Sequence, residues 1–171
     1  NVVDFDVTDI DGVSTVVVAL HNKLHMLTVN DSRFVVDGTA IETQCNSVLF
    51  YGKTGEKKVA CLLSDYASAL KTMTLTDNQL TNFNIYNLDI NAVDIVVDPT
   101  NPERFIVASD NGDFWNNGYS QLHSMTSQGG LVWSGPFLIG SVNKASLQVR
   151  EQDSGKLEIL FGSSNGMYWI H

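Results

Sequence analysis

Short apolar runs recur along the whole chain, and each is followed by a polar turn. Four such runs occupy residues 16–20, 59–63, 105–108 and 159–162. They are rich in Val, Ile, Leu and aromatic residues, which favour strands. No long window shows the i, i+3, i+4, i+7 spacing of an amphipathic helix. The pattern therefore predicts an all-β chain.

The polar turns carry an internal repeat. Residues 109–115 read SDNGDFW and residues 163–169 read SSNGMYW, so the two segments share Ser, Asn, Gly and Trp. Asn-Gly is a strong hairpin signal, because its backbone twist matches the strands that it joins. Weaker copies surround the two earlier apolar runs. We divide the chain into four repeats, at about residues 1–45, 46–91, 92–144 and 145–171.

Each repeat predicts a small antiparallel sheet. It contains a strand, a polar turn, a more apolar strand, a second turn and a third strand. A fourth strand is expected at residues 33–36, 82–86 and 130–133. Four-stranded repeats of about 40 to 50 residues are typical of β-propeller blades. We predict a β-propeller of about four blades within one domain spanning residues 1–171, with a β-sandwich as the alternative.

The turns also resemble those of known propeller families. Residues 94–115 are similar to a Trp-Asp-type blade in their order of strand, Pro-containing turn, strand, Gly turn and Trp. The Ser-x-Asn-Gly turns resemble Asp-boxes of sialidase-like and sortilin-like propellers, which are structural turns and imply no activity. Asp9-Ile10-Asp11-Gly12 before an apolar strand resembles the integrin-type calcium repeat. That resemblance implies calcium at Asp9 and Asp11, and a solvated acidic turn is the alternative.

Four blades could close into a ring, as in hemopexin-like domains, or form half of a larger ring. We expect a larger ring, since the fourth repeat lacks its outer strand and an open propeller exposes strand edges and apolar faces. The chain also begins with Asn1, which suggests a processed product or a piece of a longer protein. The predicted partner is accordingly another protein or the rest of the same propeller.

Charge narrows the range of partners. The chain has 10 Lys+Arg against 19 Asp+Glu, a net charge of −9, which disfavours binding to nucleic acid or to anionic membranes. No apolar run approaches the roughly 20 residues that span a bilayer. The two cysteines, Cys45 and Cys61, permit at most one disulfide. Because Cys61 lies in an apolar run, we expect a buried free thiol there.

The repeated aromatic turns supply the candidate binding residues. Trp115 and Trp169 should occupy equivalent places on neighbouring blades, either packed between blades or exposed as pockets beside polar side chains. We therefore nominate as binding residues Trp115, Trp169, Asn111, Asn165 and Asp110.

No catalytic or cofactor-binding constellation is present in the sequence. We predict a non-catalytic propeller that acts as a protein-interaction scaffold or structural subunit, by fold-level analogy. A carbohydrate-binding lectin is the alternative, with glycan as the ligand. A sialidase-like hydrolase is a third hypothesis, weakened because its acidic substrate needs an arginine cluster and the chain has only Arg33, Arg104 and Arg150. The compartment stays open.

Overall fold

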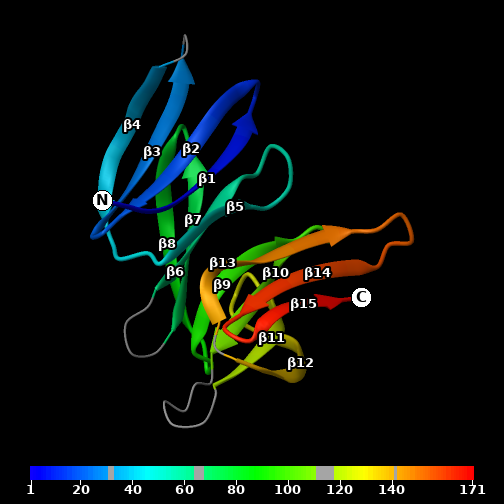
Figure 1. Ribbon diagram of the computed structural model, residues 1–171. Helices are drawn as coiled ribbons and strands as arrows, with labels where there is room; N and C mark the ends of the chain where they lie inside the picture. The colour runs from blue at the N-terminus through cyan, green and yellow to red at the C-terminus, as the bar shows by residue number, and fades with distance from the viewer. Residues whose placement is uncertain (31–32, 64–67, 111–117, 141) are drawn as a thin grey trace. The chain divides into compact units, whose positions relative to one another are not determined.

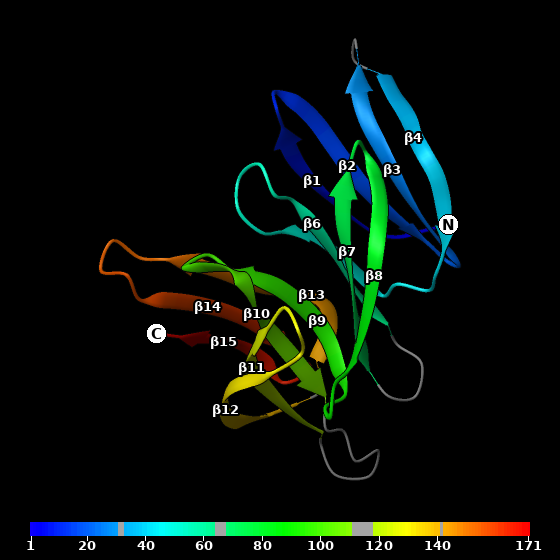
Figure 2. The ribbon, with the colours of Figure 1, turned by 180° about the vertical axis from the view of Figure 1, so that it is seen from behind.

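A computed structural model describes residues 1–30, 33–63, 68–110, 118–140 and 142–171, and its regular structure is entirely β-strand (Figure 1). In these residues the strands form four antiparallel sheets. Consecutive strands pair in order along the chain in every sheet, so each sheet is a simple meander. Figure 2 shows the same meanders from behind. The all-β prediction is confirmed.

We call the four sheets blades 1 to 4. Blade 1 contains β1 (Val2–Ile10), β2 (Val13–Leu20), β3 (Lys23–Asn30) and β4 (Arg33–Glu42). Blade 2 contains β5 (Ser47–Tyr51), β6 (Lys58–Leu63), β7 (Ala69–Thr76) and β8 (Gln79–Asn87). Blade 3 contains β9 (Ala92–Asp98), β10 (Asn101–Asp110), β11 (Tyr119–Thr126) and β12 (Leu131–Ile139). Blade 4 contains β13 (Val142–Glu151), β14 (Leu157–Ser163) and β15 (Gly166–Ile170).

Tight turns with positive φ join neighbouring strands, at the predicted turn of residues 9–12 and at a second turn that was not predicted. Asp11 and Gly12 connect β1 to β2 with φ of 52° and 82°, and Asp77 and Asn78 connect β7 to β8 with φ of 49° and 58°. Two central residues with positive φ define the hairpin turn whose twist suits antiparallel strands. Short polar residues and glycine tolerate this backbone region best.

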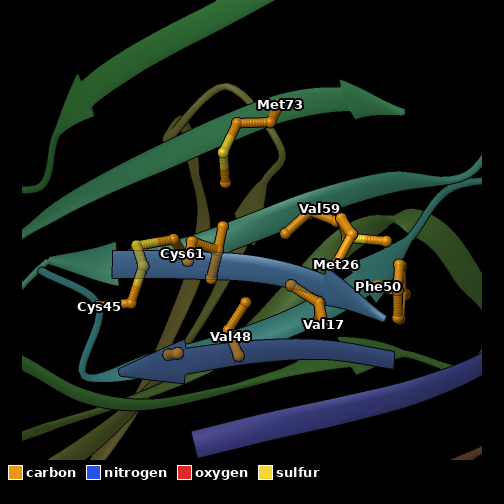
Figure 3. Close-up of a cluster of buried hydrophobic side chains, with 10 residues drawn as sticks. Val17, Met26, Cys45, Val48, Phe50, Val59, Cys61 and Met73 are labelled. Atoms are coloured by element: carbon orange, nitrogen blue, oxygen red, sulfur yellow. A yellow bond between two sulfur atoms is a disulfide. The ribbon is translucent and has the colours of Figure 1, made fainter. Parts of the chain in front are cut away.

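The chain divides into two compact units, each built around two blades. The first unit comprises Asn1–Asp65 and Ala69–Tyr86, and the second comprises Tyr66–Ser68 and Asn87–His171. Blades 1 and 2 share one buried cluster, which includes Val17, Met26, Val48, Val59 and Met73 (Figure 3).

Blades 3 and 4 have their own buried cluster in the second unit, formed by Ile106, Leu122, Leu147, Ile159 and Phe161 together with smaller residues. In both units the core therefore lies between the facing sheets of a blade pair.

The prediction of a free thiol at Cys61 is wrong. Cys45 and Cys61 form a disulfide with a sequence separation of 16 residues, and both are buried in the core of the first unit (Figure 3). Cys61 lies on β6, whereas Cys45 lies in the segment between β4 and β5. The apolar run around Cys61 correctly indicated burial, but it could not show that the segment leading into blade 2 passes over that strand.

Carboxylates link the first strands of paired blades. In the first unit Asp4 Oδ2 accepts hydrogen bonds from Val48 N at 2.9 Å and from Ser47 Oγ at 3.0 Å, and Asp6 Oδ2 accepts one from Phe50 N at 2.7 Å. Such charge-assisted bonds satisfy N–H groups at the edge of a sheet, which would otherwise have no strand partner.

The second unit repeats this link. Asp94 Oδ2 of β9 accepts a hydrogen bond from Leu147 N of β13 at 3.3 Å. Asp4 pairs with Ala19 on the neighbouring strand, and Asp94 pairs with Ala108, so the two aspartates occupy the same ladder position in blades 1 and 3.

Among the described residues, the structure has no helix that is both long enough and apolar enough to cross a membrane.

Candidate functional site

One face of blade 4 brings together exposed aromatic, aliphatic and charged side chains. Gln148 pairs with Leu160 and Arg150 with Glu158 across β13 and β14, while Leu160 pairs with Trp169 on β15. Directly paired residues lie on the same face of a sheet. The opposite face of blade 4 packs in the core shared with blade 3, the preceding blade along the chain. We call a face that is turned towards the preceding blade a leading face and the other face of the same blade its trailing face, so the exposed face of blade 4 is its trailing face.

Glu158 is the polar centre of the trailing face. Its side chain is buried, and it pairs with the exposed guanidinium of Arg150. Gln152 Nε2 donates a hydrogen bond to Glu158 Oε1 at 3.3 Å, and His171 Nδ1 lies 3.7 Å from the same oxygen. The hydrogen bond from Arg150 lowers the pKa of Glu158, with further help from Trp169 and Gln152. Glu158 is therefore held as a carboxylate at neutral pH.

Trp169 supplies the large apolar surface. The residue is 61% exposed, and its indole stacks on the imidazole of His171 with ring centroids 5.7 Å apart. A cavity of about 280 Å³ lies beside it, lined by Gln148, Val149, Arg150, Glu158, Leu160 and Trp169. An exposed indole next to the ion pair of Glu158 and Arg150 offers stacking together with directional hydrogen bonding, which suits a protein side chain or a sugar ring.

The exposure of Trp169 is unusual for its position in a blade. The third-strand residues that pair with the second residue of each apolar run are Met26, Thr72, Ser124 and Trp169. The first three are at most 4% exposed, whereas Trp169 is not buried. The sequence pattern could not reveal this difference, because it needs the strand register.

The predicted equivalence of Trp115 and Trp169 stays a prediction, because Trp115 lies outside the described residues. The position that matches Trp169 in blade 3 is Ser124. Residues 111–118 separate β10 from β11, but only residues 164–165 separate β14 from β15. Asn111 also lies outside the described residues.

The remaining nominated binding residues lie in turns and strand ends. Asn165 is exposed in the β14–β15 turn, and its N–H donates a hydrogen bond to Ser163 Oγ at 3.2 Å. Asp110 ends β10, and its buried Oδ1 has no hydrogen-bond partner among the described residues. The trailing face thus includes Trp169 from the predicted set, while the residues around it were not predicted.

Asp9 and Asp11, the predicted calcium ligands, lie in the β1–β2 turn. Asp9 Oδ1 accepts a hydrogen bond from Gly12 N at 2.8 Å. Both line a polar cavity of about 680 Å³ with Asp77 and Asn78 from the β7–β8 turn. In the described part of the chain, no three His, Cys, Asp or Glu side chains are grouped so that they could hold a metal ion. Calcium at this turn stays a prediction.

A buried hydrogen-bonded chain in blade 3 was not predicted from the sequence. Ser109 Oγ lies 2.7 Å from His123 Nε2, and Ser134 Oγ lies 2.9 Å from His123 Nδ1. Burial lowers the pKa of His123, so its imidazole is neutral at physiological pH. Ser109 is completely buried. The chain connects β10, β11 and β12 and leaves no room for a substrate at the hydroxyl.

Comparison with known proteins identifies the fold. The structure is similar to the β-propeller domain of Myceliophteria thermophila Cps50 (Swd1), with a TM-score of 0.60 and 11% identity over 96% of this chain and 49% of that chain. It is also similar to the Dos1 propeller, with a TM-score of 0.63 and 9% identity over 98% of this chain and 44% of that chain. The fold is a β-propeller.

Its four antiparallel sheets are propeller blades, and the β-sandwich alternative is wrong. The chain spans about half the length of the two propellers that it matches. No family model and no curated protein matches the sequence. At such low identity the similarity establishes the fold alone.

Proposed function

We propose that this chain is a non-catalytic β-propeller scaffold that binds a protein partner through the trailing face of blade 4. One observation carries the proposal. Trp169 is exposed at a ladder position that is buried in the other three blades, and it stands beside a cavity lined by Gln148, Arg150 and Glu158. Trp and Arg are the residue types most often responsible for binding energy at protein interfaces.

Binding without catalysis fits the chemistry of the described residues. The Ser109–His123 pair has the spacing of a nucleophile and its base, but Ser109 is fully buried and the second imidazole nitrogen faces Ser134 rather than a carboxylate. A working triad needs an accessible hydroxyl and an acidic orienting group. The pair supports the sheet instead.

A photo-crosslinking amino acid at Met167 tests the proposal. Met167 is 72% exposed on β15 of the same blade, so a bound protein should be captured covalently and identified by mass spectrometry. Trp169→Lys should reduce that adduct by about 30-fold or more, as expected for loss of a central aromatic contact worth at least ~2 kcal/mol. Phe83→Lys is a matched control, since Phe83 is an exposed aromatic on β8. An adduct unaffected by Trp169→Lys would refute the proposal.

Glycan binding is the second candidate function. The flat indole of Trp169 could stack on a sugar ring, while Glu158, Arg150 and Gln148 offer hydrogen bonds to its hydroxyls. A glycan array with the wild-type chain and with Trp169→Lys separates the two functions. Trp169-dependent binding to a defined glycan, together with no protein adduct at Met167, would favour the lectin.

A further inference from the structure

Blade 1 exposes a large apolar side chain at a position where the side chain is buried in each of the other three blades. In each blade, one residue of the first strand pairs with the third residue of the apolar run on the second strand. These equivalent residues are Phe5, Val48, Ile95 and Leu147. Val48, Ile95 and Leu147 are 3–4% exposed, whereas Phe5 is 61% exposed. A position built for burial is therefore open in blade 1.

Most of the other side chains on that face are apolar as well. Register places on the same side of blade 1 the side chains of Phe5, Val7, Val16, Val18, Leu27 and Phe34. Val7 and Phe34 are exposed like Phe5. We call this the leading face of blade 1. A continuous apolar sheet face in contact with water is a mark of an interaction site.

We propose that the leading face of blade 1 packs against the trailing face of blade 4 from a second copy of this chain, in a head-to-tail arrangement. The inference rests on the proposed function, because it names the protein partner of the Trp169 surface. Two copies joined in this way contain eight blades.

Packing within the units provides the template. In the first unit the face of blade 1 that carries Val17 and Met26 packs on the face of blade 2 that carries Val48. In the second unit blade 3 packs in the same sense on the face of blade 4 that carries Leu147. Each interface joins a trailing face to a leading face. A second copy extends this rule without a new type of contact.

The two open faces also match in chemistry. The trailing face offers Leu160, Met167 and Trp169 as apolar surface, and its charged residues Glu158 and Arg150 neutralise each other. The titratable residues on the described part of the leading face between Phe5 and Phe34 are His25, which pairs with Val18, and Asp9, which pairs with Ser14 beside the β1–β2 turn. Asp9 lies at the turn end of the face, where its Oδ1 accepts the Gly12 N–H. Although each copy has a net charge of −9, docking over the rows of Phe5 and Val7 would therefore bury no unpaired carboxylate, which is the main electrostatic penalty at an interface.

Gln148 gives a further match. Gln148 pairs with the second residue of the apolar run in blade 4, and Asp6 pairs with the second residue of the apolar run in blade 1, so the two residues are equivalent. Asp6 accepts the Phe50 N–H of the next blade, and the side-chain carbonyl of Gln148 can accept an N–H in the same way. The length comparison agrees, because one copy covers 49% and 44% of the two propeller chains that it matches.

Complementation between two interface variants tests the arrangement. Native mass spectrometry and light scattering should find a dimer for the wild-type chain. Phe5→Lys and Trp169→Lys should each weaken the dimer by about 30-fold or more, because each removes a central aromatic from both interfaces. Mixing the two variants should restore part of the dimer, because one of its two junctions then joins an unchanged Trp169 side to an unchanged Phe5 side, whereas the other junction carries both substitutions.

Several outcomes would overturn this inference. A wild-type chain that stays monomeric at all concentrations, a Trp169→Lys variant that dimerises normally, or a mixture that does not recover would each do so. Phe83→Lys should dimerise like the wild type, and circular dichroism would show whether each variant is folded. If the wild-type chain is monomeric but Met167 still captures another protein, the scaffold proposal stands and the head-to-tail dimer fails.

A cysteine pair gives an answer that does not depend on charged variants. Under oxidation, Phe5→Cys combined with Gln148→Cys should give a covalent dimer, because both positions lie on the first strands of the facing blades. Phe5→Cys alone should not crosslink. Crosslinking by the single variant alone would indicate that two leading faces pack on each other, and would refute the head-to-tail arrangement.

Discussion

Reduction of the Cys45–Cys61 disulfide should destabilise the first unit of the chain. The bond closes a loop with a sequence separation of 16 residues. Crosslinking restricts the unfolded ensemble, and a loop of this length corresponds to about 3 kcal/mol in the chain-entropy model. With urea m-values of about 1–3 kcal/mol per molar, the midpoint of unfolding should fall by about 1–3 M.

The distribution of tryptophans makes the assay specific. All three tryptophans, Trp115, Trp133 and Trp169, belong to the second unit, whereas the disulfide lies in the first. Far-ultraviolet circular dichroism reports on both units, and tryptophan fluorescence reports on the second alone. Reductant should therefore shift the transition seen by circular dichroism. A matching shift in fluorescence would show in addition that the two units unfold together.

A midpoint that does not move on reduction would refute this reasoning, provided that mass spectrometry confirms two free thiols. The double variant Cys45→Ala and Cys61→Ala serves as the control. It should be less stable than the oxidised wild type, and reductant should have no further effect on it. A shift in the control would mean that reductant acts on something other than the disulfide.

Three further predictions concern single side chains, and urea titration checks each. Asp4→Ala leaves the Val48 N–H without its carboxylate acceptor, so the free energy of unfolding should fall by about 1–3 kcal/mol. Burial lowers the pKa of His123 from 6.5 in the folded chain. As the pH falls, His123 therefore binds a proton in the unfolded chain before it does so in the folded chain. The folded state should keep its full stability above pH 6.5 and lose stability as the pH falls towards the native pKa of His123. His123→Asn should remove this pH dependence. The hydrogen bond from Arg150 lowers the pKa of Glu158 from 4.5. The ionised Glu158 carboxylate therefore stabilises the folded chain above pH 4.5, and this stabilisation is lost as the pH falls below 4.5. Glu158→Gln should abolish that loss.

The sheets were predictable because every level of the sequence agrees on them. Apolar runs such as residues 59–63 and 105–108 lie within β6 and β10, and turn-forming residues separate the strands. Local preference and burial favour the same structure there. The disulfide was not predictable, since sequence separation alone does not show that the segment around Cys45 passes over the buried β6 strand.

The candidate site needed strand register, which the sequence gives only where a turn is short. Arg150 and Glu158 lie at equal distances from the turn between β13 and β14, so that hairpin alone would have placed them opposite each other. Ser109 and His123 flank the long connection between β10 and β11. No count of residues across such a connection fixes a register, and the buried hydrogen-bonded chain was therefore missed.

The blade-to-blade carboxylates indicate that the structural repeat is a pair of blades. Asp4 in blade 1 accepts the N–H of Val48 in blade 2, and Asp94 in blade 3 accepts the N–H of Leu147 in blade 4. In the sequence, Ser47 precedes Val48 and Ser146 precedes Leu147. Blades therefore alternate between an aspartate and a serine type. A ring extended by whole copies of this chain keeps that alternation, because each junction again joins a serine-type blade to an aspartate-type blade. Such a junction has no carboxylate link of its own. In the proposed dimer it would rely on side-chain packing and on the Gln148 amide, and the large exposed side chains of Phe5 and Trp169 suit such a junction.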